Sequence, residues 1–330
     1  MTVLPLVFFA TGFFLLIRGT DFFVTNAARI ARRTGFSPLT IGFVVMGFGT
    51  SVPELFVGIS ASISGNTEIV LGNAVGSSIA SLLLVPGVAA LFCPIYLYRK
   101  TIRSGILFIL IAAGILWIVV SDAFLDHAFF SVISRSDGLI LLCFFCIFSG
   151  RVISFAGSVN SGVKNVPEPV NHNSPVIFVV VLKGLFGCLC LAVGSRFIVD
   201  SGASLAKLMG ISERVMGMTV IALGTALPQL ATCIAAARRG FTEIVVGTVS
   251  GAVFFNIFFV LGVSALIRPI AISPLAYGDM GMLTLASFML FVFLFAGNTR
   301  MMGKSEGGFT ISLYLVYIGY LLFPVIGFFS

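Results

Sequence analysis

The sequence contains very little charge. Only 9% of its 330 residues are Asp, Glu, Lys or Arg, whereas a soluble domain carries roughly a quarter. Its hydrophobic share is 58% and its mean hydropathy is +1.15, so much of its surface must face something other than water. The scarcity of charge excludes a soluble enzyme, a nucleic-acid-binding domain and a disordered protein. It predicts a membrane protein with several spans.

Histidine and cysteine are also scarce. The chain has two His and six Cys, and the cysteines lie in or beside apolar stretches. Cys143 with Cys146 and Cys188 with Cys190 have the spacing of metal or redox sites but no His or acidic neighbour, so we expect packed cysteines. The HExxH and GxSxG motifs of hydrolases do not occur. The sequence therefore favours a transporter over an enzyme and indicates no cofactor.

Apolar segments suited to crossing about 30 Å of hydrocarbon as helices recur along the chain. They fall at 3–28, 36–63, 68–92, 104–121, 137–150, 175–199, 211–237, 243–267, 280–297 and 309–328. The polar stretch 151–174 separates the first five from the second five. We expect an all-α membrane protein of ten spans, with one half at 1–150, a linker at 151–174 and the other half at 175–330.

The basic residues predict how the chain crosses the membrane. Most lysines and arginines lie in the loops after the odd-numbered spans, for example Arg32, Arg99 and Arg238. The positive-inside rule places these loops in the cytoplasm and both termini outside, in a plasma (inner) membrane. Because each half has five spans, the second half enters the membrane from the opposite side.

The two halves also repeat one another. A shift of 175 residues places Gly19–Gly87 on Gly194–Gly262 without a gap. The densest matches are Gly49-Thr50-x-x-Pro53-x-Leu55 with Gly224-Thr225-x-x-Pro228-x-Leu230, and Thr67-Glu68-Ile69-Val70-x-Gly72 with Thr242-Glu243-Ile244-Val245-x-Gly247. Apolar helices that match by chance do not align Gly, Thr, Pro and Glu in one register. An inverted duplication of this kind is the architecture of secondary transporters.

Each half contains a proline in the middle of a span. Pro53 and Pro228 lack an amide hydrogen, so we expect both helices to be interrupted at Gly-Thr-x-x-Pro. Backbone freed at membrane depth is tolerated only where it is buried or lines a cavity. Thr50, Ser51 and Glu54 add hydroxyl and carboxylate oxygens, the ligands of hard cations. A proline kink alone explains Thr50 and Pro53 but not a carboxylate in mid-span.

The following span in each half adds further polar groups. It begins with Gly72-Asn-Ala-Val-Gly76-Ser77 in the first half, and Ser77 and Ser81 share a helix face. Asn256 holds the corresponding place in the second half. The glycines suit either close helix packing alone or a backbone approach to an ion. Glu68 and Glu243 begin these spans, where they suit a helix N-terminus or an entry path.

These motifs resemble the two alpha-repeats of the calcium/cation antiporter superfamily, typified by sodium/calcium exchangers. The resemblance covers both repeats, at 36–92 and 211–267, and all ten expected spans. It implies alternating access, in which two long tilted helices, the first and sixth spans, slide past the other eight. It also implies a cation site, for which Glu54, Thr50 and Ser77 are the expected metal ligands. The other implied members are Ser51, Ser81, Thr225, Gln229 and Asn256, with carbonyl groups at Gly47, Gly76 and Ala222.

The second repeat departs from the family pattern. A family Glu falls on Gln229, a family Asp on Asn256, and two family serines on Ala226 and Ala252. Glu54 is then the only carboxylate of the site. One carboxylate balances a monovalent cation or a proton but leaves Ca²⁺ with an excess charge in a medium of low dielectric constant. The residues therefore favour an atypical antiporter that exchanges a cation against H⁺ or Na⁺.

Two alternatives remain open at the level of sequence. Conventional Ca²⁺/Na⁺ exchange requires water and carbonyl groups to compensate for Gln229 and Asn256. A non-transporting membrane sensor or regulatory protein would explain why the second repeat alone has lost its acidic residues. In every case we expect inorganic cations (Ca²⁺, Na⁺, K⁺ or H⁺) and the lipid bilayer as partners, and no nucleic acid. The sequence carries no signal for an oligomeric state.

Overall fold

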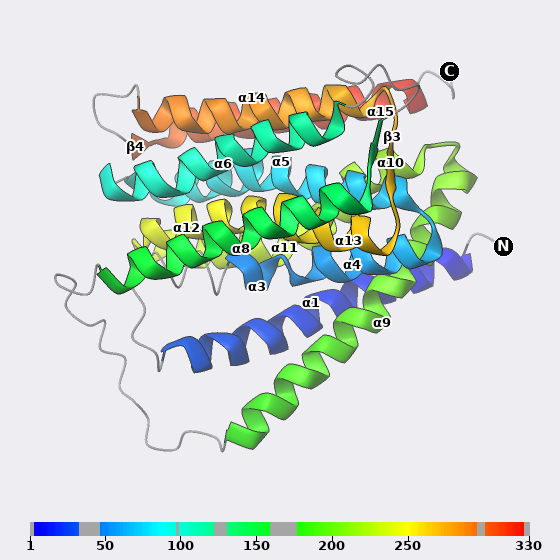
Figure 1. The fold of residues 1–330 in the computed structure, drawn as a ribbon, viewed down its shortest axis with the longest axis horizontal. Helices are drawn as coiled ribbons and strands as arrows, with labels where there is room; N and C mark the ends of the chain where they lie inside the picture. Colours follow the sequence, from blue (N-terminus) through cyan, green and yellow to red (C-terminus); the bar gives the residue numbers. More distant parts are fainter. Residues whose placement is uncertain are drawn as a thin grey trace.

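The structure is a computed structural model that describes residues 3–32, 47–96, 99–121, 131–158, 177–295 and 301–326. Nearly all of these residues are helical, and Figure 1 shows the helices lying side by side. Within the described part, six helical stretches are long and apolar enough to cross a membrane. They are Leu4–Phe22, Thr67–Phe92, Leu182–Met209, Glu213–Arg238, Ile244–Ile267 and Ala276–Phe293. The chain is therefore a helical membrane protein, since a helix satisfies all its backbone groups internally in lipid.

The helices follow the apolar segments closely. In the first half they are α1 (Val3–Arg32), α3 (Phe48–Thr50), α4 (Val52–Ser64), α5 (Thr67–Phe92), α6 (Arg99–Val120) and α8 (Arg135–Ser158). In the second half they are α9 (Ile177–Met209), α10 (Glu213–Met216), the π-helix η2 (Gly217–Ile221), α11 (Ala222–Arg238), α12 (Thr242–Phe254), the π-helix η3 (Phe255–Val260), α13 (Leu261–Ile267), α14 (Ala276–Phe295) and α15 (Lys304–Ile326). The start of the segment expected at 36–63 and most of the linker expected at 151–174 lie outside the described residues. Helix α8 continues to Ser158, past the expected start of that linker.

The expectation of an all-α fold was wrong in one detail. Strand β1 (Ile95–Tyr96) pairs with β4 (Met301–Met302), and β2 (Ser131–Ile133) pairs with β3 (Ile270–Ile272). Both pairs are antiparallel. Strands of two or three residues leave no periodic pattern in a sequence, because alternation needs at least four residues to be seen. Each pair links a connection of the first half to one of the second.

Helices α1 and α9 cross each other at one edge of the molecule (Figure 1). Glycines allow this crossing: a Cβ on Gly12 would lie 2.8 Å from the Gly194 carbonyl oxygen, and one on Gly19 would lie 2.9 Å from that of Gly187. Small residues bring helix backbones together in this way in membranes. The offset of 175 residues relates Gly12 to Gly187 and Gly19 to Gly194, so each close contact joins positions that correspond between the halves.

Helix α5 lies in the centre of the helical core. It is apolar on all sides and buried along most of its length, as expected of a helix surrounded by other helices. A Cβ on Gly72 would lie 2.7 Å from the Arg214 carbonyl oxygen, and one on Gly76 would lie 2.8 Å from Met218 Cα. These two glycines therefore set the close approach of α5 to α10 and η2, which lead into α11.

Candidate cation site

The first-half helix is interrupted beside its proline, as the sequence predicted. Helix α3 ends at Thr50, Ser51 adopts φ −93° and ψ 5°, and α4 starts at Val52 with Pro53 in its first turn. The Thr50 hydroxyl donates a hydrogen bond of 3.4 Å to the Gly47 carbonyl oxygen. The break places Thr50, Ser51 and Glu54 within one short segment, all of them about 1% exposed.

The expectation of the same interruption in the second half was wrong. Helix α11 runs without a break from Ala222 to Arg238 and contains Pro228. The irregular turn lies earlier, in the π-helix η2, which ends one residue before Ala222. A π-helical turn shifts the hydrogen-bond partner by one residue and often marks a functional site. It relieves the strain before Pro228 without breaking the helix.

Polar side chains of α5 and α11 are hydrogen-bonded to one another at the core. Ser77 Oγ lies 3.1 Å from Thr225 Oγ1, and Ser77 also donates a 3.5 Å hydrogen bond to the Ala222 carbonyl oxygen. Ser81 Oγ donates a 2.8 Å hydrogen bond to Gln229 Oε1. All four side chains are at most 1% exposed. Four predicted side chains of the site are thus brought together in two pairs.

Asn73 joins these groups, although the sequence analysis did not select it. Its Oδ1 accepts a 3.3 Å hydrogen bond from Thr225, and its Nδ2 donates a 3.4 Å hydrogen bond to the Glu54 carbonyl oxygen. Asn73 precedes Ser77 by four residues, so the spacing that selected Ser77 and Ser81 would also have found it. It connects the interrupted segment of the first half to α11.

Glu54 is the acidic residue of the site. Its carboxyl group interacts with the Thr225 hydroxyl, yet its Oε2 atom has no hydrogen-bond partner among the described residues. Ser51 Oγ and both polar atoms of the Asn256 side chain likewise have none there. Unpaired buried polar groups are costly and normally indicate a bound ion or water. These oxygens are therefore available to a cation, whereas Ser77, Ser81 and Thr225 already bond to protein.

The charge of the site comes from one residue. Among the described residues, no group of three or more His, Cys, Asp or Glu side chains is arranged to hold a metal ion. The position of the expected second carboxylate is occupied by Gln229, which is neutral. The remaining ligands are hydroxyl, amide and carbonyl oxygens, which suit hard cations. Such a site can bind a cation or, at Glu54, a proton.

A second buried polar group lies outside this site and was not expected. Arg214 of α10 forms an ion pair with Asp279 of α14, and Tyr317 of α15 donates a 2.9 Å hydrogen bond to Asp279 Oδ1. The sequence analysis placed Arg214 in a loop, but its side chain is only 9% exposed. Glu68, considered for an entry path, accepts a 3.4 Å hydrogen bond from the Arg214 backbone amide. This group ties the segment leading into α11 to α14 and α15.

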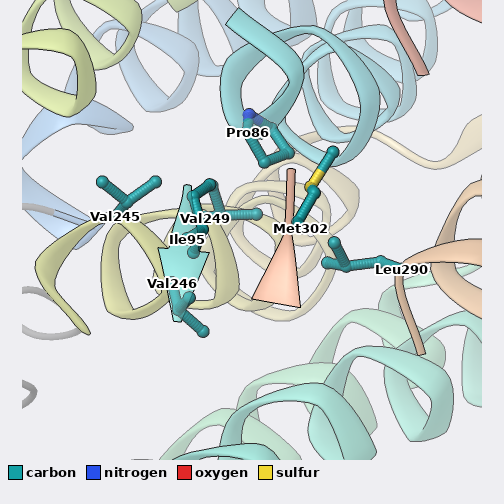
Figure 2. A pocket seen from close by; sticks show the side chains of 7 residues that line it. All are labelled: Pro86, Ile95, Val245, Val246, Val249, Leu290 and Met302. Atoms are coloured by element: carbon teal, nitrogen blue, oxygen red, sulfur yellow. The ribbon is translucent and has the colours of Figure 1, made fainter. Parts of the chain in front are cut away.

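One apolar pocket lies apart from the polar site (Figure 2). Its lining residues are Pro86, Ile95, Val245, Val246, Val249, Leu290 and Met302. The lining offers no polar atom to a cation, which must exchange its hydration shell for oxygen ligands. This pocket is therefore not the cation site.

The helical fold and its buried carboxylate define a membrane transport protein rather than an enzyme. The profile of the family described as "Sodium/calcium exchanger protein" matches residues 4–154 and 176–323. The chain therefore belongs to the sodium/calcium exchanger family, whose members are ion antiporters.

Individual relatives match over nearly the whole chain. The inner membrane protein YrbG of Escherichia coli K12 is 34% identical over 93% of this chain and 94% of its own. The sodium/calcium exchanger MaX1 of Methanosarcina acetivorans is 29% identical over 87% of this chain and 90% of its own. A solved structure of the sodium-calcium exchanger NCX_Mj superimposes with a TM-score of 0.66, at 30% identity over 97% of this chain and 99% of that one.

Proposed function

We propose that this protein exchanges a cation for H⁺ or Na⁺ through a site with a single carboxylate, Glu54. The observation that carries the proposal is the unpaired Glu54 Oε2, which lies in a buried setting beside Ser51 on the interrupted helix. The carboxylate binds either a cation or a proton, and the competition between them couples the two fluxes. Alternating access exposes Glu54 to each side of the membrane in turn.

Charge balance argues for monovalent ions. A monovalent cation on ionised Glu54 is neutral as a pair, and so is protonated Glu54 without a cation. Ca²⁺ on the same site leaves one excess positive charge, which is costly in a medium of low dielectric constant. Gln229 does not offset this cost, and its Oε1 already accepts a hydrogen bond from Ser81.

We further propose ten spans in two inverted five-helix repeats, at 1–150 and 175–330, joined by 151–174. The contacts at corresponding positions support this arrangement: Gly87 packs on Gly307 where α5 meets α15, and Gly262 packs on Gly138 where α13 meets α8. The glycine crossing of α1 and α9 supports these two helices as the pair that slides. The basic loops support termini outside a plasma membrane.

Conventional Ca²⁺/Na⁺ exchange is the second candidate. Relatives that carry the name sodium/calcium exchanger match most of the chain. In that case the Asn256 side-chain oxygen and bound water would supply the ligands that the missing carboxylates provide elsewhere.

Flux in proteoliposomes decides between the candidates. We would record Ca²⁺, Na⁺ and K⁺ movement under an imposed Na⁺ gradient and, separately, under a pH gradient. The proposal expects monovalent flux driven by pH that is lost in Glu54→Gln and kept in Glu68→Gln, a matched control outside the site. Uptake of Ca²⁺ driven by Na⁺, without dependence on pH, would establish the second candidate instead.

A further inference from the structure

Polar groups continue away from Glu54 along the interface between α4 and α13. Glu54, Gly58 and Ser62 are four residues apart and share one face of α4. Ser264 of α13 meets this face, because a Cβ on Gly58 would lie 2.7 Å from Ser264 Oγ. The Ser264 hydroxyl is therefore level with Gly58, between Glu54 and Ser62 along the helix.

These polar groups lack protein partners in the described part of the chain. Glu54 Oε2, Ser264 Oγ and Ser62 Oγ have no hydrogen bond to any described residue, and their side chains are at most 1% exposed. Buried helical serines usually bond the carbonyl one turn back, as Ser78 does to Ala74 at 2.7 Å. Buried polar groups without such a bond are normally satisfied by ordered water.

The spacing of the three groups suits single water molecules. Four residues of helix rise by about 6 Å, and a water that bonds on both sides spans roughly 5.6 Å. One water thus fits between Glu54 and Ser264, and another between Ser264 and Ser62. Beyond Ser62 the helix ends at Gly65, where the chain is partly exposed. The row of polar groups therefore reaches from Glu54 to the end of α4.

The corresponding interface of the second half has no such row. At the offset of 175 residues, Gly58, Ser62 and Ser264 correspond to Cys233, Ala237 and Ala89. All three are buried. Gln229, which corresponds to Glu54, is bonded to Ser81. Only the interface of α4 with α13 combines an unpaired carboxylate with unpaired hydroxyls.

We infer that water molecules bound at Ser264 and Ser62 carry protons between Glu54 and the end of α4 at Gly65, a role that rests on the proposed exchange against H⁺. Each water or hydroxyl accepts one proton and releases another. The last transfer converts the Glu54 carboxylate into the carboxylic acid, and the reverse sequence removes the proton when a cation binds. The described charges on helices packed against α4 are exposed on α1 and α9 or lie at helix ends, as Glu68 and Arg238 do, and none of them bonds to Glu54.

Two serine variants test the route in proteoliposomes. Ser62→Ala with Ser264→Ala should slow pH-driven cation flux about tenfold, the effect of losing hydrogen bonds along the relay. Cation self-exchange, which moves no proton, should keep its wild-type rate. Ser287→Ala is the matched control, because this buried serine bonds the Leu283 carbonyl of its own helix at 2.7 Å. An equal loss in both assays, or a loss in neither, would overturn the inference.

Cysteine labelling separates this inference from the proposed function. In a cysteine-free background, Ser264→Cys and Ser62→Cys should react with Ag⁺ faster than Ser287→Cys, with unreacted thiols counted by maleimide after denaturation. Equal, slow reaction at all three positions would overturn the hydrated route, whatever the transport result. If the wild type shows no pH-driven flux, exchange against H⁺ fails and the proton role with it, whereas fast labelling would still support bound water at these serines.

Discussion

The Ser81 hydroxyl donates a 2.8 Å hydrogen bond to Gln229 Oε1, whereas Asn256 and Glu54, which correspond to these two residues at the offset of 175, do not bond to each other. In one half the two positions form a closed pair between α5 and α11. In the other half the carboxylate and the amide both keep unpaired polar atoms, because neither satisfies the other. The cation site is therefore asymmetric, although the helices that build it correspond between the halves.

Restoring a second carboxylate should convert the site to one that favours divalent ions. In Gln229→Glu, two negative charges would balance Ca²⁺, so we expect Ca²⁺ affinity to rise on the order of tenfold or more. Isothermal titration of the purified protein with Ca²⁺ measures this change. Gln229→Met, which is similar in length and carries no charge, is the control. Unchanged Ca²⁺ affinity in Gln229→Glu would contradict the role of charge balance.

Cation binding should weaken as the pH falls. A proton on Glu54 removes the only negative charge of the site, so acid competes with the cation, and higher pH favours cation binding. Cation-dependent changes in the fluorescence of Trp117, the single tryptophan, measured across a pH series would follow this competition. Glu54→Gln should bind cations weakly at every pH, and pH-independent binding by the wild type would contradict the competition.

The buried ion pair between Arg214 and Asp279 should matter for stability. Removing one partner leaves a buried charge unpaired, which costs about 3–5 kcal/mol. Asp279→Asn is therefore expected to lower the thermal unfolding midpoint in detergent markedly. Replacing both residues, as in Arg214→Met with Asp279→Leu, should recover much of the loss, because it leaves no unpaired charge. A double variant less stable than Asp279→Asn would show that the pair acts in another way.

The glycine crossing of α1 and α9 should be required for transport. A Cβ on Gly194 would lie 2.8 Å from the Gly12 carbonyl oxygen, so Gly194→Ala must push the helices apart. We expect slower flux with cation affinity retained, since α1 and α9 carry no predicted ligand. Gly114→Ala is the control, because no atom outside its own helix turns lies within 4 Å of its Cβ position. Normal flux in Gly194→Ala would mean that close contact is not needed.

Much of the site could be predicted from residue types and spacing. The polar residues at Thr50, Ser77, Ser81 and Thr225 stand out because polar groups are rare within apolar spans, and the structure buries all of them. Asn73 was missed although the same spacing applies to it. Arg214 was misplaced because a charge near the end of a span is normally solvated, and its buried partner Asp279 lies on a distant helix.

The sequence by itself determined that the chain enters a membrane, because its scarcity of charge permits no other solvent. It also determined the repeat and the break at Pro53, since both are written in residue order. Only the tertiary structure decided that Pro228 lies in an unbroken helix and that Gln229 pairs with Ser81 while Glu54 Oε2 stays unpaired. The physical reason is that hydrogen bonding in a buried core depends on which helices face each other. Residues 148 positions apart, such as Ser81 and Gln229, acquire their partners only when the helices pack.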